Sequence, residues 1–250
     1  MRAIDALLAD VTVDAPIHGV MVGAFWTAVV LEADPPRAGL ASSLRPLAHT
    51  GRPAVADPGR LHEQSGRELA EGLQSASMLE AAIGMAALNA LLEVDEAACR
   101  ELNAERVIIE RGRGPDKSVA IVGHFPFVDR VREAVERCSV LELTPRPGDI
   151  PAERADEILP QADVVALTGT SLINHTFDEM VGFCRPDAYV LLLGPSAPLS
   201  PVLFDFGVDA ISGTRVADPT RVLPLVSQGA NFRQIKREGG VRLLTMVKGS

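Results

Sequence analysis

From about Lys117 to the C-terminus, short apolar runs alternate with runs in which apolar residues recur at helical spacing. The apolar runs predict strands at residues 118–122, 140–143, 163–167, 189–193 and 210–211. The intervening runs predict helices at 128–137, 152–159, 176–184 and 218–228, with a helical turn at 201–206. Wholly apolar strands suit burial on both faces, and strands that alternate with helices form parallel sheets with right-handed crossovers. We therefore predict a Rossmann-like, parallel-sheet domain over residues 113–250.

The pattern before residue 112 is different, because strands come first and helices follow. A short helix is predicted within residues 1–15. The β-branched and aromatic residues from Val20 to Glu32 predict strands that form a small antiparallel meander with residues 37–42. Helices are predicted at 68–73, 78–92 and 93–102, and Ser77 with Glu80 predicts a capping box at the second of them. Residues 1–112 are thus a small α+β domain, and the chain as a whole belongs to the α/β class.

Charge and hydropathy narrow the class of protein. The chain of 250 residues has a net charge of −9 at pH 7 and shows no basic stripe, which argues against a nucleic-acid partner. Its most apolar stretch, residues 19–31, is shorter than the ~20 residues that a membrane helix needs, and the N-terminus carries no secretory signal. These patterns predict a cytoplasmic protein without a membrane partner.

The cysteines and one basic cluster have ordinary explanations. Cys99, Cys138 and Cys184 are far apart and form no CxxC pair, so neither a zinc knuckle nor a disulfide framework is indicated. Cys138 and Cys184 fall inside apolar helical patterns, which favours buried thiols. Arg111, Arg113 and Lys117 form one short basic cluster in a Gly/Pro-containing connection, which indicates a solvated linker.

The loops after the predicted strands are the places to look for a ligand, because open parallel sheets bind ligands outside the carboxyl ends of their strands. The loop after the first strand has a single glycine, Gly123, and not a GxGxxG motif, so a dinucleotide pyrophosphate lacks its usual seat. Glu142, near the end of the second strand, could accept a ribose hydroxyl or could be a solvated or ion-paired carboxylate.

Two further loops are rich in small polar residues. Residues 168–176 combine hydroxyl and amide side chains, which suits either anion binding at the next helix or simple capping by Asn174 or Thr176. Residues 194–201 contain three prolines, and this stiff segment is either a preorganised loop that presents Ser196 or a structural turn.

His124 and His175 follow the first and third predicted strands of the Rossmann-like part. In the usual strand order 3-2-1-4, we expect their loops to come from neighbouring strands. Two imidazoles facing one cleft can hold a divalent metal or serve as acid and base, although the sequence shows no third metal ligand. The two histidines are therefore candidates both for metal ligation and for catalysis, and a satisfied polar residue is the ordinary alternative for each.

Several of these motifs resemble a known family, the one described as "putative heavy-metal chelation". The resemblance rests on VGHFP at 122–126, TGTSLINHTFDE at 168–179 and GPSAPLSPVLFDFG at 194–207. It is supported by Val22-Gly23, by Gly39 to Ala41 and by AIGMAALNA at 82–90, which contains Asn89. At the positions of His124 and His175, the family often has other residues, glycine in the case of His175.

The resemblance implies an enolase-N-terminal-like domain followed by a Rossmann-like domain, a ligand cleft between them, and a homodimer. Transferred motif by motif, it implies the following cleft residues: Gly123, Phe125, Pro126, Glu142, Thr168, Thr170, Asn174, Thr176, Gly194, Pro195, Ser196 and Pro198.

Two functions are compatible with these observations. The first is binding of a small molecule, a divalent metal or a metal chelate in that cleft. Soft metals prefer thiolate ligands, and the predicted site has no cysteine, so a chelate held through its organic part is favoured over a bare soft ion. The second is an enzyme, of transferase or lyase type, acting on a small anionic metabolite. It could use an adenosine-containing cofactor such as S-adenosylmethionine, with Glu142 on the ribose and His124 or His175 moving a proton.

Overall fold

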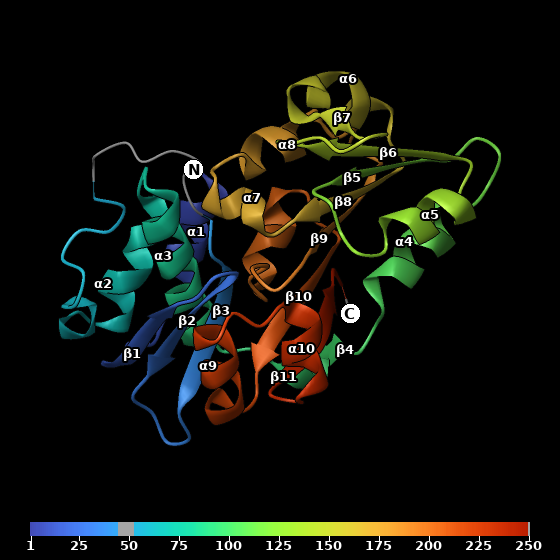
Figure 1. The fold of residues 1–250 in the computed structure, drawn as a ribbon. Coiled ribbons are helices and arrows are strands. Elements are labelled where there is room, and N and C mark those ends of the chain that lie inside the picture. Colours follow the sequence, from blue (N-terminus) through green and yellow to red (C-terminus); the bar gives the residue numbers. More distant parts are fainter. Residues whose placement is uncertain (45–52, 250) are drawn as a thin grey trace.

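The computed structural model describes residues 1–44 and 53–249 and confirms the mixed α/β architecture (Figure 1). Its strands form two sheets: a three-stranded antiparallel sheet in the order β1-β2-β3, and an eight-stranded sheet in the order β4-β11-β10-β9-β8-β5-β6-β7. The small sheet and its helices lie beside the large sheet in Figure 1, with the strands of the large sheet between helices on both faces.

The first part of the chain confirms the predicted meander and its covering helix. Its elements are α1 (Ala3–Asp10), β1 (Ile17–Val22), β2 (Trp26–Leu31), β3 (Arg37–Ser42), the 3-10 turn η1 (Leu61–Glu63), α2 (Gly66–Glu71), the 3-10 turn η2 (Gly72–Gln74) and α3 (Met78–Leu91). Helix α3 is rich in alanine and buried on most sides. A Cβ at Gly39 would collide with the backbone of Ala86, so glycine lets α3 lie directly against β3.

The second part contains the predicted parallel sheet. Its elements are η3 (Glu96–Ala98), β4 (Cys99–Arg100), α4 (Ala104–Gly112), β5 (Ser118–Val122), α5 (Val128–Ala134), β6 (Arg137–Glu142), β7 (Ile150–Pro151), η4 (Ala152–Arg154), α6 (Ala155–Ile158), η5 (Leu159–Gln161), β8 (Val164–Thr168), α7 (Thr170–Ile173), α8 (Phe177–Phe183), β9 (Tyr189–Leu193), η6 (Pro201–Phe206), β10 (Ala210–Val216), α9 (Pro219–Ser227), α10 (Phe232–Arg237) and β11 (Val241–Val247). Strands β5 to β10 pair in parallel, whereas β11 and β4 pair antiparallel at one edge.

The strand order differs from the expected 3-2-1-4. Numbered along the chain as β5, β6, β8, β9 and β10, the parallel strands are arranged 2-1-3-4-5, because β8 returns on the side of β5 opposite to β6. The loops after β5 and β8 do come from neighbouring strands, but only because of this order: in 3-2-1-4 the second strand would separate the first from the third. The reversal of strand order now lies between β5 and β8, and that position is where such sheets open a ligand crevice.

Alternate residues of the parallel strands enter two different cores. Val119 and Ile121 of β5 pack under Ile108 of α4 and the helix α5. Ala120 and Val122 face the other way, into a larger cluster that continues without interruption into α1, α3 and the small sheet. This period-two alternation is the reason why each wholly apolar strand is buried on both faces. The predicted domain boundary between residues 112 and 113 stays a prediction.

A third core joins the end of the chain to its beginning. Val222 and Val226 of α9 and Ile235 of α10 pack with Ala28 and Leu40 of the small sheet. The C-terminal helices therefore cover the face of the small sheet that α3 leaves free, as the position of α9 beside β1 and β2 in Figure 1 also shows.

Several local predictions are wrong. Residues 93–102 form the 3-10 turn η3 and the edge strand β4, not a helix, because β4 pairs with β11. Ser77 does precede α3, but it makes no capping box: its hydroxyl donates to Ala54 O, and Glu80 accepts hydrogen bonds from Ala56 N and the Ser75 hydroxyl. Capping boxes do form elsewhere, between Ser65 and Glu68 at the start of α2 and between Asn231 and Gln234 at the start of α10.

Of the predicted solvated linker at residues 111–117, residues 113–117 form a mostly exposed turn, but Arg111 and Gly112 belong to a helix. Residues 104–112 form α4, and Arg111 at its end lies over the ring of Tyr189 with 3.6 Å between the guanidinium carbon and the ring centroid. Lys117 pairs with Asp163 across 3.0 Å. Cys138 lies in strand β6 and not in a helix. The strand at 210–211 extends to Val216, and α10 and β11 were not predicted at all.

Among the described residues, no helix combines the length and the hydropathy that crossing a membrane would require.

Candidate ligand-binding site

Three glycines stand at the carboxyl ends of neighbouring parallel strands. Gly123 follows β5, Gly169 follows β8 and Gly194 follows β9. The N–H group of each one donates to the next strand, to Leu141 O, Leu193 O and Ser212 O respectively. The sheet ladder therefore continues one residue beyond each strand while leaving no side chain there.

Two of these glycines have backbones that other residues rarely adopt. Gly123 has a φ of 100° and Gly194 a φ of 113°. A Cβ at Gly123 would lie 3.0 Å from the Cβ of Thr168, and one at Gly169 would lie 2.5 Å from Ala197 N. The space above the strand ends thus depends on glycine for both its backbone turns and its close contacts.

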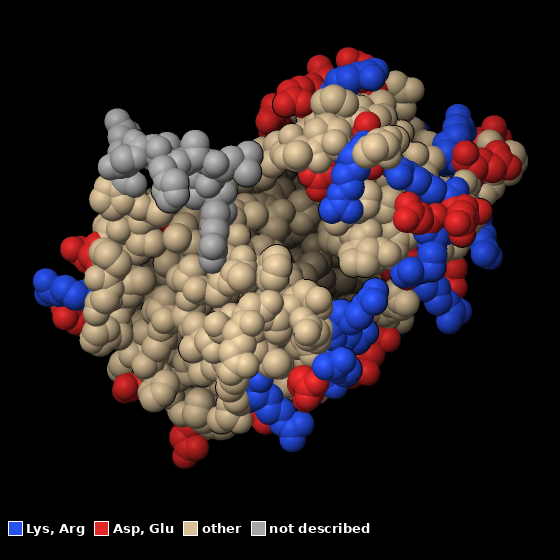
Figure 2. All heavy atoms as spheres, viewed as in Figure 1, with Lys and Arg blue, Asp and Glu red and all other residues tan. Residues whose placement is uncertain are grey.

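A hollow opens on this face of the molecule, between the small sheet and the β5–α5 connection (Figure 2). Uncharged atoms form most of its visible wall, and charged side chains gather along its right-hand rim. This agrees with the switch point between β5 and β8, so the strand-end residues provide the candidate site.

Phe125 forms one wall of the strand-end space. Its ring lies 3.6 Å from the position of a Cβ at Gly123 and 3.8 Å from that at Gly194, so the ring lies beside both glycines. Its other neighbour is Phe127, with the two rings almost parallel at a centroid distance of 5.2 Å. Pro126, between them, is exposed. The predicted site residues Gly123, Phe125 and Gly194 are therefore brought together.

Hydroxyl groups lie next to these glycines. The side chains of Thr168 and Thr170 are hydrogen-bonded at 2.9 Å, and both are half-buried. The N–H groups of Gly169 and Thr170 already bind protein acceptors. The expected anion site at this helix start therefore lacks two of its donors, and the four-residue α7 offers only a short helix behind them.

Ser196 joins the loop after β9 to the small sheet. Its hydroxyl accepts the N–H of Ser42 at 2.9 Å and lies 3.2 Å from the Ser42 hydroxyl. Ser196 and Pro198 are buried, whereas Gly194 and Pro195 are half-buried. The stiff loop thus fixes β3 against the strand ends and does not present the Ser196 hydroxyl to solvent.

Asn174 and Thr176 form a local turn between α7 and α8. The side-chain oxygen of Asn174 accepts the Thr176 hydroxyl at 2.8 Å and the Thr176 N–H at 3.3 Å. This pairing closes the turn and is not the predicted cap, because α8 begins after Thr176 without a side-chain cap hydrogen bond. A ligand contact by either residue stays a prediction.

The two candidate histidines have different partners. The ring Nδ1 of His124 lies 3.1 Å from Oδ2 of Asp149, and its backbone N–H donates to Oε1 of Glu142 at 2.7 Å. His175 is exposed, and its Nε2 lies 2.8 Å from Leu73 O, a carbonyl of the first part. Its φ of 63° lies in the left-handed region that favours glycine. The shared metal site predicted for the pair stays a prediction.

Asp149 is a site residue that the sequence reasoning missed. Its side chain is completely buried, and it also accepts Arg132 at 2.8 Å and the N–H of Arg146 at 3.1 Å. Burial by itself would raise the pKa of Asp149, but these hydrogen bonds and the one with His124 keep it below its usual value. Asp149 ends the turn-like sequence PRPGD, so its one sequence signal indicated only a turn.

The described residues do not fit a bare heavy-metal ion. No group of three or more His, Cys, Asp and Glu side chains among residues 1–44 and 53–249 is arranged to hold one. Burial raises the pKa of the Cys138 thiol and of the Cys184 thiol to about 11 each, so both are protonated at neutral pH. Thiolate is the ligand that soft metals prefer, and a protonated thiol does not supply it.

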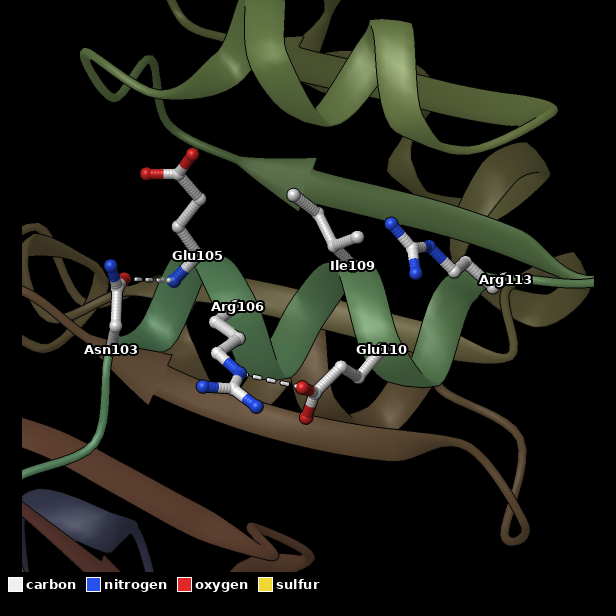
Figure 3. Close-up of a pocket in the computed structure, with 6 residues that line it drawn as sticks. All are labelled: Asn103, Glu105, Arg106, Ile109, Glu110 and Arg113. Carbon is white, nitrogen blue, oxygen red and sulfur yellow. Dashed lines mark hydrogen bonds and ion pairs between the residues drawn. The ribbon is translucent and has the colours of Figure 1, made fainter.

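A second cavity, of about 320 Å³, lies along α4 (Figure 3). It is lined by Asn103, Glu105, Arg106, Ile109, Glu110 and Arg113. All of these come from one helix and its two ends, and Arg106 pairs with Glu110 across 2.6 Å in an exposed i,i+4 ion pair. This is a solvated helix surface on which Glu105, Arg106 and Glu110 are ion-paired, and it offers no converging wall for a ligand.

Comparison with family models identifies the chain. Two models match, over residues 4–92 and 107–245, and both are described as "putative heavy-metal chelation". The second alone spans more than half of the chain. The protein belongs to this family. The resemblance found in the strand-end motifs is confirmed, and so is the family's α/β fold.

Other members share this family's fold over nearly the whole chain. A crystal structure of a family protein of unknown function from Desulfitobacterium hafniense matches with a TM-score of 0.84 and 26% identity, covering 98% of this chain and 97% of that one. One from Pyrococcus horikoshii, at 19% identity, matches with a TM-score of 0.80 over the same shares and shows the fold alone. An uncharacterized protein of Methanocaldococcus jannaschii is 29% identical over 158 residues, which are 60% of this chain and 60% of that relative.

Proposed function

We propose that this protein binds a metal chelate, holding a small organic molecule that carries the metal, in the hollow at the carboxyl ends of β5, β8 and β9. The observation that carries the proposal is the glycine-edged space beside Phe125, with the hydroxyls of Thr168 and Thr170 next to it. Neutral hydroxyls and an aromatic ring suit an organic molecule better than they suit a bare ion. The family description is consistent with a ligand of this kind.

The donor set favours a chelate over an ion bound by the protein alone. A structural heavy-metal site needs several converging ligands, and the described residues offer no group of three. A chelate supplies most of these ligands itself. The protein then has to recognise only the organic part and, at most, one open position on the metal.

Native mass spectrometry of the purified protein, before and after denaturation, with elemental analysis beside it, tests this function. The expected result is an organic adduct near one per chain that is lost on denaturation, with an equivalent amount of metal. A stoichiometric metal without any organic adduct would contradict the proposal. So would an empty protein that also fails to bind copper(II)–terpyridine, a flat aromatic chelate with one open metal position.

A variant with a matched control locates the site. Thr168→Val keeps the shape of the side chain and removes the hydroxyl that is hydrogen-bonded to Thr170, and we expect the adduct to be retained less well. Thr220→Val is the control, because its hydroxyl is exposed and bonds only to Asp218 in the cap of α9. Equal loss in both variants would argue against the strand ends as the site.

A second function is favoured by one contact. Glu142 at the end of β6 reaches the β5–α5 connection through its 2.7 Å bond from the His124 N–H, which is where an acid accepts a ribose in many doubly wound folds. An enzyme with an adenosine-containing cofactor remains the alternative proposal. A metal-free adenosine-type adduct in the same mass spectra, lost in Glu142→Gln, would favour it over chelate binding.

A further inference from the structure

His124 is held at two points at the mouth of the β5–α5 connection. Its backbone N–H is fixed by Glu142, and its ring Nδ1 faces the Asp149 carboxylate across 3.1 Å. The side chain retains 15% of its exposure, whereas that of Asp149 retains none. The ring therefore has a buried acceptor on its Nδ1 side, keeps some exposure, and belongs to the residue directly after Gly123 at the strand ends.

The partners of Asp149 decide which ring nitrogen carries the proton. Oδ1 of Asp149 accepts Arg132 at 2.8 Å, and Oδ2 accepts the Arg146 N–H at 3.1 Å, so the carboxylate is surrounded by donors. A carboxylate only accepts hydrogen bonds, and Nδ1 of His124 must therefore donate. In the neutral ring this leaves the lone pair on Nε2.

Nε2 of His124 is available to a ligand. No described residue forms a hydrogen bond with it. Among the described residues, Nε2 of His124 is also not one of the buried side-chain atoms that lack a hydrogen bond, so it is not sealed inside the protein. His175 differs, because its Nε2 is already used by Leu73 O.

We infer that Nε2 of His124 binds the metal of the chelate as one of its ligands. The metal is a divalent ion of borderline softness, such as Cu²⁺, Ni²⁺ or Zn²⁺, and the organic chelator fills its other positions. Asp149 is the positioning residue for this imidazole. Metal-binding histidines commonly donate their second ring N–H to a carboxylate, which fixes the tautomer and the ring orientation. Here the described residues supply no group of three or more His, Cys, Asp and Glu side chains around it, so the chelator has to provide most of the ligands. The inference rests on the proposed function and specifies which chelates the hollow accepts: those with an open position for imidazole.

The first measurement needs no metal. Long-range ¹H–¹⁵N NMR correlations of the histidine rings report the tautomer of His124 in the wild-type protein, assigned by the loss of its signals in His124→Gln. We expect the Nδ1–H form. Asp149→Asn should shift the population toward Nε2–H, whereas Asp129→Asn, which removes an exposed carboxylate near the same Arg132, should change nothing. A wild-type ring in the Nε2–H form would overturn the inference.

The second measurement uses copper(II)–terpyridine, followed by equilibrium titration and by electron paramagnetic resonance. The wild type should show one additional imidazole nitrogen on the copper. His124→Gln should lose this nitrogen and bind at least about 10-fold more weakly, and Asp149→Asn should lose about 10- to 100-fold in affinity. His62→Gln, which removes a histidine of the turn η1, is the control and should behave as the wild type.

Terpyridine without copper separates the inference from the proposed function. If the copper complex binds the wild type and His124→Gln equally well and without an imidazole signal, the chelate is held by its organic part and the role of His124 is wrong. If neither terpyridine nor its copper complex binds the wild type, both are contradicted. If the copper complex binds tightly and shows the imidazole signal only when His124 is present, the proposed function and the role of His124 are both supported.

Discussion

The two ends of the parallel sheet are built from opposite kinds of residues. At the amino ends, the Asp163 carboxylate accepts the Ser118 N–H at 2.8 Å, and it is reached by Lys117 and by Arg185. Asp209 similarly accepts the Val190 N–H at 2.8 Å. At the carboxyl ends, glycines and hydroxyls leave open space. One end uses charge to tie adjacent strands together, and the other gives up side chains so that a ligand can approach.

This difference separates residues that stabilise the sheet from residues that serve the site. Substitutions at the amino ends should lower the free energy of unfolding without affecting a ligand. Substitutions at the carboxyl ends should lower both the free energy of unfolding and the affinity for a ligand. The glycines there allow the backbone conformation and also leave the hollow free of side chains.

The largest loss of stability is expected for Asp163→Asn. The carboxamide keeps the shape of the side chain but weakens its bonds to Lys117 and Arg185. We expect the free energy of unfolding to fall by about 2–3 kcal/mol. Asp187→Asn is the matched control, since it removes an exposed carboxylate from the same Arg185 and should cost under about 0.5 kcal/mol. Urea denaturation at pH 7 compares them, and equal losses would show that Asp163 has no special role.

The stability difference between the wild type and Asp163→Asn should depend on pH. Hydrogen bonding from the Ser118 N–H, assisted by Lys117, holds the pKa of Asp163 well below its usual value although burial opposes this. A depressed pKa contributes stability that is complete above the unfolded-state pKa of about 3.9 and that is lost as pH falls toward the folded-state pKa. The difference between wild type and Asp163→Asn should therefore be constant from pH 7 to pH 5 and shrink below about pH 4. A difference that grew on acidification would contradict this assignment.

At the carboxyl ends, Gly123→Ala should reduce both stability and binding. The left-handed backbone costs a side chain about 1–2 kcal/mol, and the new Cβ would also be 3.0 Å from Thr168. Gly59→Ala shares the positive φ but has open space around it, so it should lose similar stability and keep its affinity for copper(II)–terpyridine. Unchanged affinity in Gly123→Ala would move the site away from the β5–β8 junction.

The smallest of these effects is expected for His175→Ala. It removes the bond to Leu73 O between the two parts, which should cost about 1 kcal/mol in urea denaturation. Affinity for the copper complex should not change. A loss of affinity as large as that of His124→Gln would restore the two-histidine metal site.

The sequence predicted the fold well where a local pattern carries the information. The apolar runs of β5, β8 and β9 were located to within one residue, because strands buried on both faces must be apolar throughout. Strand β11 was missed, although it pairs with β10 over seven residues. Its sequence VRLLTMV is intermediate between alternating and continuous patterns, and the strand lies between β10 and the two-residue edge strand β4.

For the site, the sequence identified the loops better than it identified the contacts. Gly123, Phe125 and Gly194 lie together as expected, because the carboxyl ends of adjacent parallel strands meet at one edge. Ser196 was expected in the site and is instead bonded to Ser42, a residue 154 positions earlier in the chain. Asp149 was missed for the same reason, since a pairing across 25 residues leaves no local signal.

The sequence by itself determined the parallel sheet, the small antiparallel meander and the strand ends at which a ligand would be sought, because periodicity and glycine placement are local properties of the chain. Only the tertiary structure decided the strand order, the burial of Asp149 behind His124 and the different partners of the two histidines. Those depend on which distant segments pack together, and packing free energy is summed over contacts that no short stretch of sequence contains.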